Sequence, residues 1–496
     1  MPKPDKLEVC MLSAEVRPYS TVGGLSDVVA ALPAALIELG VEVRVLSPLY
    51  RQVRAFRTSG RRAGGLKKLA DLKVPLPGRV HESAIYIDPG EKPTRNYFIE
   101  QDEYFDREGI YNEESTGVGY PDNFERFNFF MVAALEALAR LEWKPHVLHC
   151  HDSQTALLPA YLKLARMADP FYKDLSTVLT IHNLAYQGVF SADKYRQTGL
   201  PHELFYGTGP FEYYGLLNMM KAGICYADVL NTVSQQYAKE IQTKEYGSGL
   251  ESVLERRKTD LYGILNGIDT KVWDPQTDPL IFANYSAQKM AGKKTNKREL
   301  QKLCGLSTED VPIVGMISRL ADQKGFDLLL ELKKELAAMN CQWVILGTGM
   351  KSYQDALEEL AREYPDKFAV YIQFDTELSH RIEAGSDMFL MPSRYEPCGL
   401  NQMYSMRYGT IPVVRNTGGL ADTVEEFDSQ NGKGTGFKFF EANARELLKA
   451  LKRAIDTYQD RALWRKIMQN AMAQDFSWEK SAREYVRLYE KAIAHR

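Results

Sequence analysis

Val22-Gly23-Gly24-Leu25-Ser26-Asp27-Val28 and Thr417-Gly418-Gly419-Leu420-Ala421-Asp422-Thr423 are closely similar stretches, one near each end of the 496-residue chain. Each places a glycine pair directly before a run of helix-forming residues. Glycines let the backbone approach a ligand closely, and the amides at a helix N-terminus attract negative charge. The repeated loop therefore predicts two similar domains that face each other and hold a phosphorylated small molecule between them.

Short apolar segments alternate with longer segments of helical periodicity around these loops. The apolar segments are 9–12, 43–46, 147–149, 178–181 and 229–233 in the first half and 313–317, 343–346, 369–372, 388–391 and 412–414 in the second. Such alternation is typical of a parallel sheet covered by helices, and its restart after the turn signal Asn266-Gly267 indicates a second domain. We expect an α/β protein with two doubly wound, Rossmann-like domains facing across a cleft, 1–262 and 263–475. A C-terminal helix, 476–496, is expected to pack back on the first domain.

The composition excludes several classes of protein. Lysine plus arginine (62) nearly balance aspartate plus glutamate (65), so the formal net charge of −3 offers no basic field for nucleic acid. No apolar run is long enough to cross a bilayer. The six cysteines are scattered without a short-spaced pair, which indicates reduced thiols. Together with a polar N-terminus that leads straight into an apolar segment, these features predict a cytoplasmic protein without a signal or transit peptide.

Two cations follow the strand expected at 313–317. Arg319 and Lys324 lie in the loop directly after it. Ligands of doubly wound domains bind at the carboxyl ends of the strands, so these side chains are placed to neutralise a diphosphate and the charge of a departing nucleotide. A solvated loop with ordinary surface charges is the alternative, and the strand-end position favours the ligand role.

A carboxylate follows the strand expected at 388–391. Glu396 precedes Cys398-Gly399-Leu400, which opens a helix. The carboxylate and the free amides beside it suit sugar hydroxyls. A lone glutamate at such a place is more often a helix cap, but the Pro-Cys-Gly context favours the ligand role.

Histidines form two further candidate sites. His182 follows the strand expected at 178–181, where a histidine is better placed to hydrogen-bond a sugar than to fill a core. His149 and His151 share one face of a strand, which raises a metal site as an alternative. No further histidine or cysteine cluster with ligand spacing completes a shell, so the metal site is the minor interpretation. An ordinary dehydrogenase is disfavoured because the complete dinucleotide fingerprint is absent.

In combination, these motifs resemble the bacterial glycogen synthase and plant starch synthase family, which are retaining glycosyltransferases of the two-Rossmann-domain (GT-B) type. The resemblance covers essentially the whole chain. It is carried by the two glycine loops, Tyr120–Asn123 with Arg126-Phe127, His182–Gly188, Leu265–Asp269, Arg319 with Lys324, and Pro392–Leu400.

The resemblance implies transfer of glucose from ADP-glucose to the nonreducing 4-hydroxyl of an α-1,4-glucan, with retention of configuration and without a cofactor or metal. The catalytic positions it implies are His182, Arg319, Lys324 and Glu396. The donor-binding positions are Thr21, Gly23, Gly24, Asp27, Asn266, Phe374, Cys398, Gly399, Leu400, Thr417, Gly418 and Gly419. The acceptor-binding positions are Tyr104 and Asp152. The implied partners are ADP-glucose and an α-1,4-glucan or maltooligosaccharide, with no nucleic acid and no membrane, in the cytoplasm or in a plastid if the chain is a trimmed plastid protein.

Three features depart from the pattern of this family or of related two-domain transferases. Thr21 stands where the family commonly has a lysine, which removes a cation from the donor phosphates and leaves the nucleotide preference open. Ser153-Gln154 replaces the usual Trp-His on the acceptor side. Met403 stands where many related two-domain transferases have a second glutamate, which starch and glycogen synthases commonly lack as well.

Two alternative functions remain open at this level. The same fold could use UDP-glucose or make a small α-glucoside. A protein of another class, a catalytically silent glucan-binding protein, could retain the fold after losing activity. The intact set of His182, Arg319, Lys324 and Glu396 argues against this second alternative.

Overall fold

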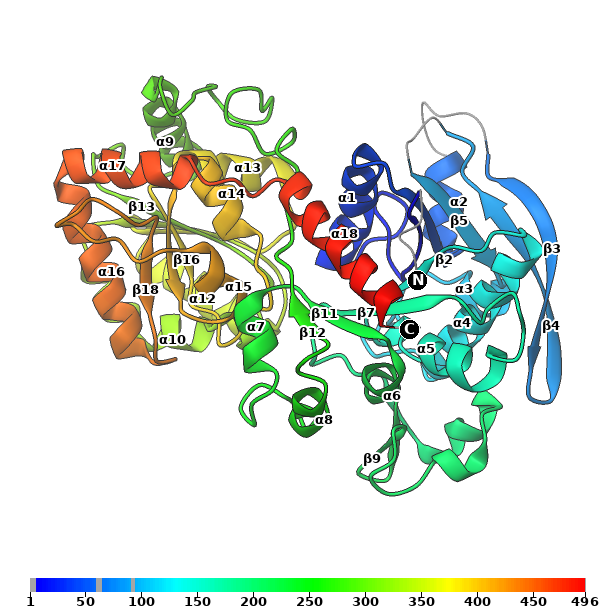
Figure 1. Cartoon of the computed structure of the whole chain (residues 1–496). Coiled ribbons are helices and arrows are strands. Elements are labelled where there is room, and N and C mark those ends of the chain that lie inside the picture. Colours follow the sequence, from blue (N-terminus) through cyan, green and yellow to red (C-terminus); the bar gives the residue numbers. More distant parts are fainter. Residues whose placement is uncertain (1–5, 59–64, 91–93, 496) are drawn as a thin grey trace. The chain divides into compact units, whose positions relative to one another are not determined.

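The computed structural model describes residues 6–58, 65–90 and 94–495, and the chain divides into two compact units (Figure 1). Unit 1 consists of Met1–Val233, Ala238–Gly267 and Trp478–Arg496. Unit 2 consists of Ser234–Tyr237 and Ile268–Ser477. The sequence pattern placed the corresponding divisions at 262/263 and 475/476, a few residues earlier.

Unit 1 is built, within the described residues, on a nine-stranded sheet in the order β12-β11-β7-β6-β1-β2-β5-β4-β3. The strands are β1 Glu8–Leu12, β2 Glu42–Pro48, β3 Lys67–Leu76, β4 Arg79–Ile87, β5 Arg95–Glu100, β6 Val147–His151, β7 Ser176–Ile181, β11 Val229–Thr232 and β12 Leu261–Gly263. All neighbours from β12 to β5 are parallel, and β4 and β3 continue the sheet antiparallel. Strands β6 and β7 are buried along their whole length, because parallel strands are covered on both faces.

The helices of unit 1 follow its strands. They are α1 Gly24–Glu38, α2 Arg51–Thr58, α3 Asp102–Phe105, α4 Asn123–Arg140, α5 Leu158–Tyr161, α6 Met219–Tyr226, α8 Glu251–Arg256 and α18 Trp478–Ala494. A small antiparallel sheet joins β8 Val189–Phe190, β10 Leu216–Asn218 and β9 Glu212–Tyr213. The helix α7 Gln235–Glu240 begins in the short segment that belongs to unit 2.

Unit 2 carries a six-stranded, wholly parallel sheet in the order β15-β14-β13-β16-β17-β18, counted over the part of the chain that the structure describes. The strands are β13 Ile313–Ile317, β14 Gln342–Leu346, β15 Phe368–Tyr371, β16 Met388–Met391, β17 Ile411–Arg415 and β18 Phe437–Phe439. The helices are α9 Ala291–Leu303, α10 Phe326–Glu331, α11 Lys333–Ala338, α12 Lys351–Glu363, α13 Thr376–Gly385, α14 Asn401–Arg407, α15 Gly418–Thr423, α16 Ala444–Gln459 and α17 Arg461–Met472. If these strands are numbered 1 to 6 along the chain, their order across the sheet is 3-2-1-4-5-6, the order of a dinucleotide-binding doubly wound sheet.

The C-terminal helix α18 belongs to unit 1. It packs on α1 and on the strands β6, β7 and β11 (Figure 1, red helix beside the blue α1). Its buried residues recur at helical spacing and are Ser481, Ala482, Tyr485, Leu488, Tyr489 and Ala492. This apolar stripe holds the last helix against the sheet formed by the first half of the chain.

The α/β class with two doubly wound domains is confirmed, and each of the ten apolar segments predicted as a strand overlaps an observed strand. The antiparallel extension β3-β4 was not predicted. Most side chains of β3 are exposed, so the sequence there has no continuous apolar run, whereas β4 ends in the apolar run Ala84–Ile87, which the strand prediction did not include. Among the described residues no helix is both long enough and apolar enough to span a bilayer.

The packing of α18 gives a direct test with a matched control on the same helix. Leu488 is buried and its neighbour Arg487 is exposed. We expect Leu488→Ala to lower the free energy of unfolding by about 2–5 kcal/mol, because it leaves a cavity under α18. Arg487→Ala should change it by no more than about 0.5 kcal/mol. Urea unfolding of the two variants and the parent measures this, and equal midpoints for the two variants would contradict the packing described here.

Candidate functional site

The strand order fixes where unit 2 can hold a ligand. The order reverses between the neighbouring strands β13 and β16, and doubly wound sheets bind ligands at the carboxyl ends of the strands at such a switch point. Arg319 and Lys324 follow β13, and Glu396 follows β16. Three of the four predicted catalytic side chains therefore come from the two loops that flank the switch point.

Backbone contacts hold these two loops together. The amide of Arg394 donates to the carbonyl of Gln323 at 2.8 Å, and the Gln323 side chain donates back to the carbonyl of Tyr395 at 3.2 Å. Gly325 has φ of +71°, and a Cβ at this position would lie 2.1 Å from the carbonyl oxygen of Pro392. Only glycine fits this approach, which places Lys324 against the second loop.

Lys324 and Glu396 form an ion pair at the centre of this site. Lys324 Nζ donates to Glu396 Oε2 at 2.6 Å, and Ser393 Oγ donates to the same oxygen at 2.9 Å. Glu396 is 5% exposed, so solvent screens the pair little. Among the described residues no hydrogen bond reaches Glu396 Oε1, and that oxygen can accept a ligand hydroxyl.

Arg319 and Phe374 present exposed side chains at the same sheet edge. Arg319 is exposed and makes no ion pair or hydrogen bond with its side chain among the described residues. Phe374 lies between β15 and α13 and is 90% exposed. An unpaired guanidinium suits a phosphate, and an exposed ring suits the face of a base. Arg319 was predicted to neutralise a diphosphate and Phe374 to bind the donor, and the structure leaves both groups accessible.

The second glycine loop packs directly on the Glu396 loop. The amide of Gly419 donates to the carbonyl of Glu396 at 3.0 Å. A Cβ at Gly418 would lie 2.0 Å from the carbonyl oxygen of Glu396, and one at Gly419 would lie 2.0 Å from that of Cys398. These glycines are required for close approach of two backbones. The amide of Gly419, a predicted donor-binding position, is thus already hydrogen-bonded within the protein.

The remaining predicted donor-binding residues of unit 2 lie in the same two loops. Thr417 and Cys398 are buried, and Gly399 has φ of +71° just before the helix α14. The Gln402 side chain donates to the carbonyls of Cys398 and Gly399 at 3.0 and 3.1 Å. Cys398, Gly399 and Leu400 are therefore held in a fixed turn rather than in a free loop.

Unit 1 has a switch point of its own, between β1 and β6. Glu15 follows β1 and is 4% exposed. Its Oε2 accepts the amides of Val22 and Gly23 at 2.6 and 2.9 Å, and its Oε1 accepts the Tyr111 hydroxyl at 2.7 Å. Burial raises the pKa of Glu15, and these hydrogen bonds oppose the rise. Glu15 was not among the predicted site residues, although it follows the end of a strand as Glu396 does.

The first glycine loop differs from the second in the reason for its glycines. A Cβ at Gly23 or Gly24 would meet no atom within 4 Å, and Gly23 has an extended backbone with φ of −144°. Thr21 is exposed, and Asp27 forms an exposed ion pair with Arg17 at 2.7 Å. The loop is therefore open on its outer side and tethered from inside by the Glu15 carboxylate.

Asp152 and His182 meet at the carboxyl ends of β6 and β7. Asp152 Oδ1 accepts the backbone amide of His182 at 2.7 Å, and Asp152 has φ of +57°. Burial raises the pKa of Asp152 to about 7, and the amides of His182 and Asn183 oppose the rise. Burial also lowers the pKa of His182 to about 3, so its imidazole is neutral near pH 7.

Asn266 and Tyr104 are both largely buried in unit 1. Asn266 follows β12, and its Oδ1 is buried without a hydrogen-bond partner in the described part of the chain. An orphaned buried acceptor of this kind is a candidate ligand contact. Tyr104 is 9% exposed and packs against the rings of His81 and Phe129. The structure thus places Tyr104 in an aromatic cluster, and its ring contacts are not to His182 or Asp152.

The alternative metal site at His149 and His151 has no support from the geometry. Both ring nitrogens of His149 are hydrogen-bonded, Nδ1 to the Tyr489 hydroxyl at 2.9 Å and Nε2 to Thr180 Oγ1 at 2.7 Å. Over the described residues, no group of three His, Cys, Asp or Glu side chains is arranged to hold a metal ion.

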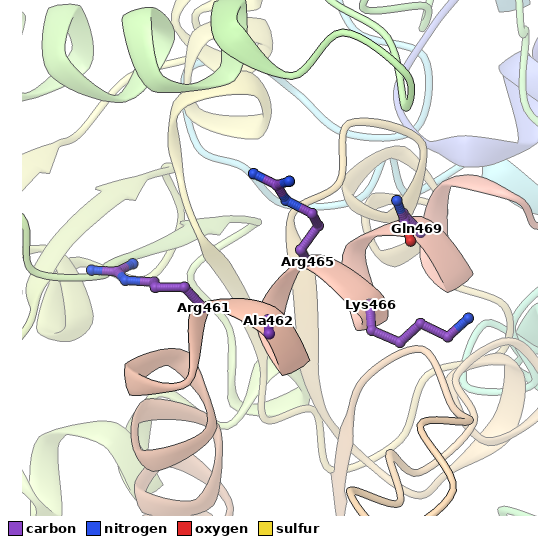
Figure 2. Close-up of a pocket in the computed structure, with 5 residues that line it drawn as sticks. All are labelled: Arg461, Ala462, Arg465, Lys466 and Gln469. Carbon is purple, nitrogen blue, oxygen red and sulfur yellow. The ribbon is translucent and has the colours of Figure 1, made fainter.

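A surface hollow of about 460 Å³ lies on α17, away from the predicted site residues. Its lining residues are Arg461, Ala462, Arg465, Lys466 and Gln469 (Figure 2). The cationic side chains spread in different directions instead of converging on one point. This hollow has no enclosed anion site, and none of the predicted site residues lines it.

Comparison with known proteins supplies the family. The model of the starch synthase catalytic domain matches residues 8–256, and that of the glycosyl transferases group 1 matches residues 298–471. The glycogen synthase of Thermosipho africanus is 47% identical over 496 residues, which cover 99% of this chain and all of that protein. The chain belongs to the glycogen and starch synthase family.

Solved structures agree with this assignment to the glycogen and starch synthase family. The catalytic domain of starch synthase IV from Arabidopsis thaliana, bound to ADP and acarbose, has a TM-score of 0.88 and 34% identity, with 99% of this chain and 100% of that chain covered. Sucrose-phosphate synthase from Thermosynechococcus elongatus has a TM-score of 0.60 and 18% identity over 99% and 100% of the two chains, and shows the fold alone. The predicted family, fold class and enzyme class, a glycosyltransferase, are confirmed.

The different roles of the two glycine loops can be tested by one substitution in each. Gly419→Ala forces a Cβ against the Cys398 carbonyl, so we expect a loss of about 1–3 kcal/mol in unfolding free energy. Gly24→Ala meets no atom and lies in the first turn of a helix, so its unfolding free energy should change by less than about 1 kcal/mol. Urea unfolding of both variants measures the two changes in unfolding free energy. A Gly24→Ala loss as large as that of Gly419→Ala would show that both loops are sterically closed.

The raised pKa of Asp152 predicts a pH-dependent stability. The folded protein binds a proton at Asp152 up to about pH 7, and the unfolded chain only up to about pH 4. The stabilisation by this proton is present below about pH 4 and is lost as the pH rises to about 7. Asp152→Asn keeps the acceptor oxygen and removes the titration. The difference in unfolding free energy, wild type minus variant, should therefore fall between about pH 4 and pH 7 and be flat above. If the unfolding free energies of the wild type and the variant changed in parallel across that pH range, the raised pKa of Asp152 would be refuted.

Proposed function

We propose that this enzyme transfers glucose from ADP-glucose to the nonreducing end of an α-1,4-glucan with retention of configuration. The observation that carries the proposal is the Lys324–Glu396 pair at the switch point of unit 2, with the unpaired guanidinium of Arg319 in the same loop as Lys324. A diphosphate needs converging cations, and a sugar needs a buried acceptor oxygen beside them.

In this proposal unit 2 binds the nucleotide sugar. Arg319 and Lys324 hold the diphosphate and neutralise the charge that develops on departing ADP. Glu396 Oε1 accepts hydrogen bonds from glucose hydroxyls, and the backbone amides of Cys398, Gly399 and Leu400 donate hydrogen bonds to them. Phe374 stacks on the adenine with its exposed ring.

Unit 1 supplies the other contacts. His182 lies beneath the glucosyl group, and Asp27 and Asn266 contact the donor. Support for Asn266 is its orphaned buried oxygen, which a ligand donor would satisfy. Tyr104 and Asp152 act on the acceptor side.

The chemical step uses the donor's own phosphate as the base. The bond between the glucose anomeric carbon and the phosphate oxygen breaks, and the acceptor 4-hydroxyl forms the new bond from the same face. The acceptor's proton passes to the departing phosphate oxygen. No protein nucleophile, metal or cofactor enters this scheme, because Arg319 and Lys324 provide the electrostatic stabilisation.

Two observations support the donor and the compartment. The similar starch synthase IV structure is bound to ADP, which favours an adenine nucleotide despite the threonine at position 21. All six cysteines are free thiols and most are buried, which suits a reducing compartment such as the cytoplasm or the plastid stroma.

Glucose transfer to a maltooligosaccharide, measured with ADP-glucose and UDP-glucose side by side, tests the proposal. We expect a clear preference for ADP-glucose. A preference for UDP-glucose would overturn the donor assignment and direct attention to Thr21. Inactivity with both donors, in a protein that still binds glucan, would establish the silent binding protein.

The role of Arg319 has a matched control in unit 2. Arg319→Ala should lower kcat by about 100-fold or more, because it removes a cation from the transition state, and should leave glucan binding unchanged. Arg362 is also an exposed arginine but lies on α12, and Arg362→Ala should retain full activity. Steady-state kinetics and glucan affinity gels measure the two effects. Equal losses in turnover and glucan binding for Arg319→Ala would refute its assignment to the donor.

A further inference from the structure

Three histidines stack in unit 1, and the proposed reaction uses only His182 of them; His149 and His151 are fully buried behind it. His149 and His151 lie on β6, and His182 follows the neighbouring strand β7. The ring centroids of His149 and His151 are 4.1 Å apart, and those of His151 and His182 are 5.2 Å apart. His151 Nδ1 lies 2.9 Å from His182 Nε2, which is a hydrogen bond between two imidazoles.

All three imidazoles are neutral near pH 7. Burial lowers the pKa of His149 and His182 to about 3, and it lowers the pKa of His151 well below its ordinary value. Each ring therefore has one N–H and one bare nitrogen. Between His151 and His182, one ring must donate and the other must accept.

The unpartnered nitrogen of His151 decides the direction of the hydrogen bond between His151 and His182. His151 Nε2 is buried and has no hydrogen-bond partner in the described residues. Orphaned buried N–H groups are rarer than under-satisfied acceptors, so the proton of His151 belongs on Nδ1, where it has a partner. The alternative, in which His182 Nε2–H donates to His151, would leave His151 Nε2–H buried without an acceptor.

We propose that His151 fixes the tautomer of His182, so that His182 keeps its proton on Nδ1 and presents that N–H as a donor to a sugar oxygen. His182 Nδ1 makes no hydrogen bond among the described residues, and its side chain is only partly buried. The identity of the ligand as a sugar rests on the proposed function, whereas the tautomer follows from the protein alone. His151 is then a positioning residue that acts through His182.

The C-terminal helix secures the base of this stack. The Tyr489 hydroxyl of α18 bonds His149 Nδ1, and Tyr485 of the same helix accepts from Asn231 at 3.0 Å. Asn231 also donates to Thr180 Oγ1, the partner of His149 Nε2. With both nitrogens occupied, His149 cannot offer an acceptor to His151, so among the described residues the His151 ring hydrogen-bonds only to His182.

Nitrogen NMR of the protein labelled with ¹⁵N-histidine tests the proposal without ligand or turnover. The one-bond and two-bond couplings within each ring distinguish the two neutral tautomers. We expect His182 to be an Nδ1–H tautomer at neutral pH. His146 is an internal reference, because its Nδ1 accepts the amide of Glu8 at 3.1 Å and its neutral form must carry the proton on Nε2. An Nε2–H or doubly protonated His182 would overturn the proposal.

Two variants of His151 link the tautomer to activity. In His151→Asn the side-chain amide can donate from nearly the position of Nδ1, so the His182 tautomer and most of the activity should persist. His151→Leu removes the donor, and kcat should fall by about 10–100-fold with little change in KM for the glucan. Thermal unfolding of both variants shows whether each is folded. Equal activity of two folded variants would contradict the positioning role, even with the expected tautomer in the parent.

The two proposals can fail separately. If the spectrum shows the Nδ1–H tautomer but no nucleotide sugar supports transfer, the proposed function fails and the tautomer assignment stands. If transfer from ADP-glucose is robust but His182 is an Nε2–H tautomer, the function stands and the role of His151 is wrong.

Discussion

The contact between the Lys324 ammonium and the Glu396 carboxylate is the interaction on which the site in unit 2 depends. It exists because the strand order reverses between β13 and β16, which brings two loops from distant parts of the sequence to one sheet edge. The two loops are joined by one backbone hydrogen bond, by one hydrogen bond from the Gln323 side chain, and by the close approach at Gly325. A buried ion pair contributes little to stability by itself, so its value here lies in keeping a cation and an acceptor oxygen adjacent and ready for a ligand.

The two glycine loops show how similar sequences can serve different physical needs. Gly418 and Gly419 lie against the backbone of the Glu396 loop, and side chains there would collide with carbonyl oxygens. Gly23 and Gly24 face open space, and the Glu15 carboxylate binds the loop amides from inside. A buried glutamate thus follows a strand at the switch point of each unit. In unit 1 it binds its own backbone, and in unit 2 it binds a lysine.

Much of the fold could be predicted from the sequence because buried parallel strands are continuous apolar runs bounded by turn residues. The same rule located Arg319, Lys324, Glu396 and His182, since residues directly after such strands lie at the binding edge. It could not show that Glu15 holds the first loop, because that depends on the path of the chain from residue 15 to residue 23. The role of His151 was also hidden, since a histidine inside a buried strand shows its hydrogen-bond partners only when the neighbouring strand is in register. The largely exposed strand β3 lacks an apolar run and was missed for that reason, whereas β4 contains the short apolar run Ala84–Ile87 and was overlooked.

The central claim is that Lys324 and Glu396 act on different parts of one nucleotide sugar. The most direct test is to measure how tightly the Lys324→Gln and Glu396→Gln variants bind ADP and ADP-glucose. Titration calorimetry without an acceptor measures all four values. The account predicts that Lys324→Gln weakens both ligands, because both contain the diphosphate. Glu396→Gln should leave ADP affinity nearly unchanged and remove the additional affinity that the glucose provides. Equal weakening of ADP and ADP-glucose by Glu396→Gln would contradict the claim, since the carboxylate would then serve the site only through the lysine.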